Sequence, residues 1–120
     1  MTSEDFRRIA LEIDGAIERS HLNHPDFRAG GKIFATIHLD ERQGMVKLTP
    51  EQQERVIREN PGVFHPASGL WGRQGCTMVR FADATEDAVS EALFLARQNL
   101  EREGRNDSQA RRVKARMRAR

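Results

Sequence analysis

The chain has 120 residues, of which 38% are hydrophobic and 32% are charged, and it contains one cysteine and one tryptophan. This length suits one small domain, because two domains would have too few apolar side chains to form two cores. A single cysteine excludes an internal disulfide framework and a zinc site built from several cysteines. No apolar run approaches the roughly 18 residues of a membrane span, and residues 1–5 do not form a basic leader. We therefore expect a cytoplasmic protein.

The net charge of +2 is distributed unevenly along the chain. Residues 101–120 contain eight Lys or Arg and three Asp or Glu, a balance of +5, whereas residues 1–100 contain 12 basic and 15 acidic side chains, a balance of −3. DNA-binding domains usually concentrate positive charge on one face, because the release of counterions supplies much of their affinity. The expected folded body lacks that excess.

Apolar spacing of three and four residues predicts a first helix that begins after a Thr2 or Ser3 cap and ends near Ser20. Its core side consists of Phe6, Ile9, Ala10, Ile13, Ala16 and Ile17. A turn over residues 21–26 follows, and alternation over residues 33–39 then predicts a central strand with apolar groups on both faces. Residues 40–44 are expected to form a hairpin loop in which Gly44 adopts a positive φ, and residues 45–48 form the returning strand.

Thr49 and Pro50 predict the start of a second helix, since a threonine hydroxyl can cap the first-turn amides and proline fits the first helical position. The breaker at residues 60–62 ends that helix. Residues 60–75 have little periodicity, apart from a possible short strand, and residues 76–81 alternate as another strand. Asp83 or Thr85 can cap a last helix, whose core stripe is Val89, Ala92, Leu93, Ala96 and Leu100. The order favours a two-layer α+β fold, an antiparallel sheet covered by helices on one side.

Three segments together resemble the MmcQ/YjbR family: HPDFRAGGKIFAT at residues 24–36, MVKLTPEQQ at residues 45–53 and LWGR at residues 70–73. The resemblance covers roughly residues 6–100. It implies a compact α+β domain compared with a double-wing arrangement and, from that comparison, DNA binding. It supplies no catalytic residue and does not extend to residues 101–120.

Three residue groups have features of chemical sites. Residues 30–32 (Gly-Gly-Lys) lack the full Walker spacing and lead into a strand, which favours a turn over a phosphate loop. His21 and His24 are too few ligands for a metal site, so a solvated turn is favoured. Cys76 with His65 could be a nucleophile and base, but nothing nearby predicts a lowered thiol pKa, and a buried strand cysteine is favoured. We therefore predict no catalytic residue, metal or cofactor.

The irregular segment around Trp71 and Arg73 is the most interesting part of the body. Trp71 offers a stacking surface, and Arg73 a planar donor for phosphate or carboxylate. Alternatively, Trp71 fills the edge of the core and Arg73 pairs with an acidic helix; this core role is favoured because aromatic burial supports small domains. Lys32 and Lys47, near the ends of neighbouring strands, either join Arg73 on one rim or are solvated charges.

The C-terminal segment is the stronger electrostatic candidate. Residues 109–120 carry no acid and six cations: Arg111, Arg112, Lys114, Arg116, Arg118 and Arg120. Such a segment is typical of a disordered or transiently helical arm that attracts nucleic acid through charge. Without a Trp or Phe anchor, a membrane is a less suitable partner. A solubilising extension without a partner is an equally weighted alternative.

The leading hypothesis is a non-enzymatic DNA-binding protein with little sequence specificity. In it, the segment 101–120, helped by Arg28, Lys32, Lys47 and Arg73, contacts phosphates, while residues 1–100 form the domain. The alternative is a protein or small-ligand binding module that uses the sheet face and the Trp71 loop. An enzyme ranks third, and a homodimer stays open.

Overall fold

The structure is a computed structural model that describes the backbone of residues 1–118 and the side chains of residues 1–104. In chain order, its elements are α1 (Ser3–Leu11), β1 (Ile17–His21), β2 (His24–Ala29), β3 (Lys32–Ile37), β4 (Gln43–Lys47), α2 (Pro50–Glu59), β5 (Phe64–Pro66), α3 (Gly69–Arg73), β6 (Cys76–Arg80), the 3-10 turn η1 (Phe81–Asp83) and α4 (Glu86–Arg118). Within this described part, none of the helices has the length and apolar character needed to cross a bilayer.

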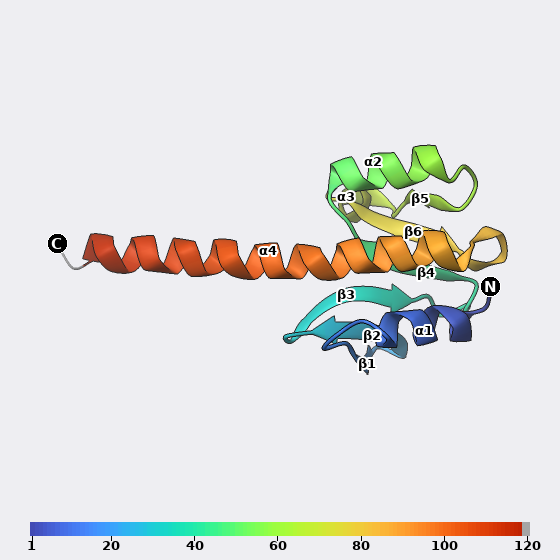
Figure 1. Ribbon diagram of the computed structural model, residues 1–120, viewed down its shortest axis with the longest axis horizontal. Helices are drawn as coiled ribbons and strands as arrows, with labels where there is room; N and C mark the ends of the chain where they lie inside the picture. Colours follow the sequence, from blue (N-terminus) through green and yellow to red (C-terminus); the bar gives the residue numbers. More distant parts are fainter. Residues whose placement is uncertain (119–120) are drawn as a thin grey trace.

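All six strands belong to one antiparallel sheet with the order β1-β2-β3-β4-β6-β5. Helix α4 packs on α1, β3 and β4, and α2 packs on β5 and β6 (Figure 1). A hydrogen bond between Gln52 and Asn99 joins α2 to α4 on the covered face. The predicted two-layer α+β fold, with helices on one side of an antiparallel sheet, is therefore confirmed.

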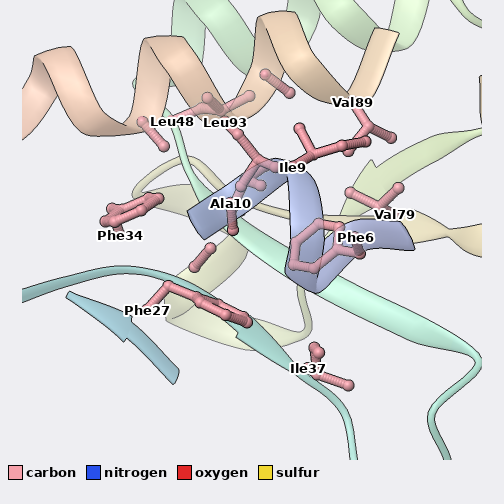
Figure 2. Close-up of a cluster of buried hydrophobic side chains, with 14 of the residues drawn as sticks. Phe6, Ile9, Ala10, Phe27, Phe34, Ile37, Leu48, Val79, Val89 and Leu93 are labelled. Atoms are coloured by element: carbon pink, nitrogen blue, oxygen red, sulfur yellow. The ribbon is translucent and has the colours of Figure 1, made fainter. Parts of the chain in front are cut away.

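The core fills the space between this sheet face and the helices. Phe6 of α1, Phe27 and Phe34 of the sheet and Leu93 of α4 are each 0% exposed and lie in one cluster (Figure 2). Every member of the predicted stripe of the last helix is buried: Val89, Ala92, Leu93, Ala96 and Leu100. Burial of these side chains supplies the main driving force for folding.

The predicted start of the second helix is also confirmed. The Thr49 hydroxyl accepts a hydrogen bond from the Gln52 amide, the Gln52 side chain accepts one from the Thr49 amide, and Pro50 occupies the first turn. Asn60 caps the C-terminus of α2. The irregular residues 60–75 contain the short strand β5 and the short helix α3.

The predicted first helix is too long. Helix α1 ends at Leu11, and residues 17–20, expected to complete that helix, belong to the edge strand β1. Gly15 has a φ of 78°, which lies outside the right-handed helical region and turns the chain into β1. Ile13 and Ala16 still pack against the core from this connection, so their apolar spacing reflects burial without a helix.

The predicted role of Gly44 is wrong. The left-handed residue of the β3–β4 loop is Glu41, with a φ of 56°, whereas Gly44 is a buried residue of β4. A Cβ at Gly44 would lie 3.0 Å from ring atoms of both Phe6 and Phe81. Glycine is needed here because two aromatic rings pack directly on the strand backbone.

The central strand β3 contains an irregularity that brings two neighbouring residues into the core. Phe27 pairs with Ala35 and Arg28 with Ile33, so Phe34 is an extra residue relative to β2. Phe34 and Ala35 are both 0% exposed. This bulge explains the interrupted alternation of strand residues between the two faces.

Helix α4 continues without a break across residue 100 and extends well beyond the sheet (Figure 1). The molecule consequently measures 57 × 29 × 25 Å. The division of the chain into a domain over residues 1–100 and a separate, disordered or transiently helical segment over residues 101–120 stays a prediction.

Candidate functional site

The face of the sheet that α1, α2 and α4 leave uncovered, called here the open face, contains a pocket of about 540 Å³. Strand alternation explains its lining. In β4, Val46 packs into the core, whereas Met45 and Lys47 on either side of it point to the open face and line the pocket. Their cross-strand partners in β6, Met78 and Cys76, line it as well. We call this hollow the sheet-face pocket.

Trp71 of α3 lines the same pocket and is 65% exposed. The favoured interpretation of Trp71 as a core residue is therefore wrong. Helix α3 is only five residues long, so its position depends on tertiary contacts. The Gln53 side chain of α2 donates hydrogen bonds to the Gly72 and Cys76 carbonyls, each at 3.0 Å. These bonds hold α3 beside β6 and so position Trp71.

A Cβ on Gly72 would clash with the backbone carbonyl of Ala67. Glycine at this position lets α3 fold back closely on the segment that precedes it. The indole neighbouring Gly72 is thereby fixed at one end of the pocket, while its ring stays largely exposed to solvent.

Toward the other end of the sheet, Asp26 of β2, the strand next to the edge strand β1, is a carboxylate with 0% exposure. It accepts hydrogen bonds from Arg28 Nε at 2.7 Å, Arg28 Nη2 at 3.0 Å and His21 Nδ1 at 2.7 Å. The Arg28 hydrogen bonds, helped by His21, lower the pKa of Asp26 against the opposing effect of burial. Asp26 therefore stays ionised, and the Arg28 guanidinium is engaged with it.

Three histidines line the pocket from this side. His21 ends β1 and His24 begins β2, their ring centroids are 6.0 Å apart, and His38 meets His24 edge-on at the same separation. The turn between them consists of Leu22 and Asn23, both with positive φ, so a solvated turn describes these two residues. His21, in contrast, is tied to buried Asp26.

No metal site is formed by this cluster. Among the residues whose side chains the structure describes, no group of three or more His, Cys, Asp or Glu is arranged to hold a metal ion. Asp26 instead orients the His21 ring through Nδ1, which leaves Nε2 as the polar atom on the other side of that ring.

Cys76 is a buried strand cysteine, as predicted. Burial raises the pKa of its thiol, and the nearby charge of Lys47 opposes that effect. A thiol of this kind is a poor nucleophile at neutral pH. His65 pairs in register with Met78 but is not itself part of the pocket lining. Its buried Nδ1 has no hydrogen-bond partner among the described residues, so no bond from this atom links it to the Cys76 thiol.

The body cations predicted to bind phosphate do not meet on one rim. Lys47 lines the pocket, and Arg28 is bound to Asp26. Arg73 ends α3, is exposed and, among the residues with described side chains, forms no ion pair, so the expected pairing with an acidic helix is absent there. Lys32 pairs across the strands with buried Ala29. The preceding Gly30 and Gly31 both have positive φ and form the predicted β2–β3 turn.

The remaining candidates of the nucleic-acid site lie outside the residues whose side chains are described: Arg111, Arg112, Lys114, Arg116, Arg118 and Arg120. Helix α4 carries the backbone of most of them.

Sequence reasoning missed the Asp26 pair and the grouping of the histidines. A signal was available for the position of Lys47 on the open face. Lys47 stands between buried Val46 and Leu48, so strand alternation makes it point to the other face. No comparable signal linked Asp26 to His21, since the error in the first helix had removed the strand that carries His21.

Comparisons with known proteins agree with this fold. A family model described as YjbR matches residues 11–98. The crystal structure of Deinococcus radiodurans protein DR2400, family-model domain DUF419, superposes with a TM-score of 0.70 at 19% identity, covering 86% of this chain and 80% of that chain. At that identity the likeness concerns the fold alone. No curated protein matches the chain.

Proposed function

This chain belongs to the YjbR family, and we propose that it is a non-enzymatic DNA-binding protein that contacts backbone phosphates with little sequence specificity. The basic C-terminal segment provides most of these contacts. The resemblance to the family implies DNA binding, yet residues 1–100 have a net charge of −3. Binding to phosphates therefore requires the basic C-terminal segment to take part.

The course of α4 is the observation that carries the proposal. Buried residues up to Leu100 anchor the helix on the body, and it continues to Arg118. At a rise of 1.5 Å per residue, the stretch after Leu100 extends roughly 27 Å. A cationic rod of that length can lie along several consecutive phosphates of a duplex, which are spaced about 3.4 Å apart per strand along the axis.

The folded body has a lesser role in this proposal. The Arg28 charge is engaged by Asp26, and Lys47 stands within an apolar pocket that a duplex backbone does not fill. Of the four body cations predicted to contact phosphate, Arg73 is the exposed one and would assist. Binding through the segment 101–120 would be steeply dependent on salt and nearly independent of base sequence, because phosphate contacts carry no direct sequence information.

The test is fluorescence anisotropy with a labelled duplex, using the full chain at about 50 and about 200 mM salt. The tail variant replaces four cations by glutamine, which keeps helix propensity: Arg111→Gln, Arg112→Gln, Lys114→Gln and Arg116→Gln. We expect its affinity at the lower salt concentration to fall by at least about tenfold, with a shallower salt slope.

A matched variant removes the same number of charges from exposed body positions: Arg19→Gln, Arg42→Gln, Arg58→Gln and Arg80→Gln. Its affinity is expected to stay within about threefold of the unchanged chain, which separates a local arm from an effect of total charge. Equal losses in the two variants, or no binding by the unchanged chain, would contradict the proposal.

A further inference from the structure

We propose that the sheet-face pocket is a binding site for a small carboxylate with an apolar body, such as a medium-chain aliphatic acid. This inference is independent of DNA binding, because it rests on the open face of the sheet rather than on the segment 101–120. It gives a role to the open face of the sheet, which the proposed phosphate contacts do not use.

The size and lining of the pocket suit a small ligand. Its volume of about 540 Å³ falls within the range of roughly 300–1,000 Å³ that is common for small-molecule sites. Met45 and Met78 face each other across β4 and β6, Ile33 extends the apolar floor, and Trp71 forms one wall. Methionine adjusts its shape to an apolar ligand, and an exposed indole gains stability by covering one.

The charges around the pocket select an anion. The ionisable residues that line it are Lys47, Cys76 and three histidines, and none of the described carboxylates is part of the lining. The nearest buried carboxylate, Asp26, already accepts hydrogen bonds from Arg28 and His21, so it does not attract a cationic ligand. An apolar wall beside a cation strengthens the attraction for a carboxylate, because the effective dielectric constant is lower there than in water.

Lys47 is the residue that would pair with the carboxylate. Its cross-strand partner is Cys76, and its carbonyl accepts a hydrogen bond from Asn99 Nδ2 at 3.2 Å, which fixes the end of β4. Met45, two residues earlier on the same face, lies further along the floor. A ligand with its carboxylate at Lys47 would therefore extend its apolar part over the two methionines.

A second copy of the chain is a poorer occupant of this face. Symmetric pairing of two open faces would bury Lys47 of each copy against a face whose pocket lining contains none of the described carboxylates. Those lysines would lose water without gaining a carboxylate partner from the pocket lining, which opposes association. A small anion neutralises Lys47 and covers Trp71 at once.

Three eight-carbon probes of equal chain length test the proposal with the full chain: octanoate, octan-1-ol and octylammonium. Trp71 is the sole tryptophan, so a change in intrinsic fluorescence reports on the pocket directly. Calorimetric titration provides an independent affinity. We expect saturable binding of octanoate, about tenfold weaker binding of octanol and still weaker binding of octylammonium.

Substitution of Lys47 separates recognition of the carboxylate from apolar burial. Lys47→Met should lower octanoate affinity about tenfold, to the level of octanol, while octanol affinity is unchanged. Lys114→Met removes the same charge from the α4 extension and should alter neither affinity. Thermal unfolding of both variants followed by circular dichroism verifies that each is folded.

Several results would overturn the proposal. Equal affinities for the three probes would show that the pocket does not recognise charge, and no saturable binding of octanoate would show that it is no site for this class. Loss of octanoate binding in Lys114→Met to the same extent as in Lys47→Met would assign the effect to overall charge. Sedimentation that reveals a dimer broken by Met78→Lys would instead show a second copy on this face.

Discussion

Asp26 shows at the scale of a single residue how a buried charge is retained in a small domain. Its carboxylate is fully buried, yet three hydrogen bonds from Arg28 and His21 replace its lost hydration. The pKa of Asp26 is lowered mainly by Arg28. A lowered carboxylate pKa adds stability at pH values above the unfolded-state pKa of 3.8, and this stability is lost as the pH falls through the folded-state pKa.

Asp26→Asn is expected to lower the free energy of unfolding by about 2 kcal/mol at neutral pH, because Arg28 loses its charged partner. The difference between the variant and the unchanged chain should shrink as the pH falls below 3.8, where the unfolded chain binds a proton at Asp26 before the folded chain does. Urea unfolding at several pH values measures both effects. Asp14→Asn, at an exposed carboxylate, is the control and should change stability little. A constant difference across the acid range would contradict the assignment.

His65 differs from Asp26, because its buried Nδ1 has no hydrogen-bond partner among the residues the structure describes. Burial, and secondarily the charge of Arg80, lowers the pKa of His65 below its ordinary value of 6.5. The unfolded chain therefore binds a proton more readily than the folded chain as the pH falls below about 6.5. The stability contributed by neutral His65 is complete above that pH and is lost below it.

His65→Leu should consequently reduce the loss of stability between about pH 7.5 and about pH 5.5. The measurement is the free energy of unfolding in urea at the two pH values, for the variant and for the unchanged chain. His38→Gln, at an exposed histidine, should retain the pH dependence. An unaltered slope in His65→Leu would show that other groups govern this pH range.

At the scale of elements, α4 combines an anchored half and a projecting half in one helix. Its first half presents the stripe that packs on α1, β3 and β4, and among the residues with described side chains Leu100 is the last that is buried, since Glu101, Arg102 and Glu103 are exposed. Gly104 lies just after the boundary, and a Cβ there would meet nothing within 4 Å. Helix propensity is therefore the main quantity that a substitution at this position changes.

Gly104→Ala is expected to stabilise the helix locally by roughly 0.5–1 kcal/mol, because alanine loses less backbone entropy than glycine. The helical signal at 222 nm in circular dichroism should increase, while the urea midpoint of the whole domain changes little. Gly75→Ala contrasts with it, since a Cβ there would clash with the backbone of Leu48 and should destabilise the fold. An unchanged helical signal in Gly104→Ala would support the prediction of a disordered segment.

At the scale of the whole molecule, the sequence was sufficient to predict the two layers of the fold but not the sheet-face pocket. The stripe from Val89 to Leu100 and the Thr49 cap are local patterns, and local patterns predict elements well. The end of α1 could not be obtained this way, because Ile13 and Ala16 fulfil a helical spacing while being buried from a turn. Periodicity measures burial, and burial alone does not specify backbone conformation.

The pocket depends on contacts between residues far apart in the sequence. Gln53 binds the carbonyl of Gly72, 19 residues away, and this contact places Trp71 on the open face instead of in the core. Strand pairing brings Lys47 beside Cys76. Neither relation is visible in composition or spacing, so the sequence predicted the exposed-loop role of Trp71 only as an alternative.

Asn99 connects the long helix α4 to the strand that carries the pocket lysine. It donates hydrogen bonds to the Lys47 carbonyl and the Gln52 side chain, one residue before Leu100, the last buried residue of α4 within the part whose side chains are described. These two hydrogen bonds connect α4 to the end of β4 and to the first turn of α2. A displacement of α4 at Asn99 would therefore alter the hydrogen bond to the Lys47 peptide group, which lies beside the pocket.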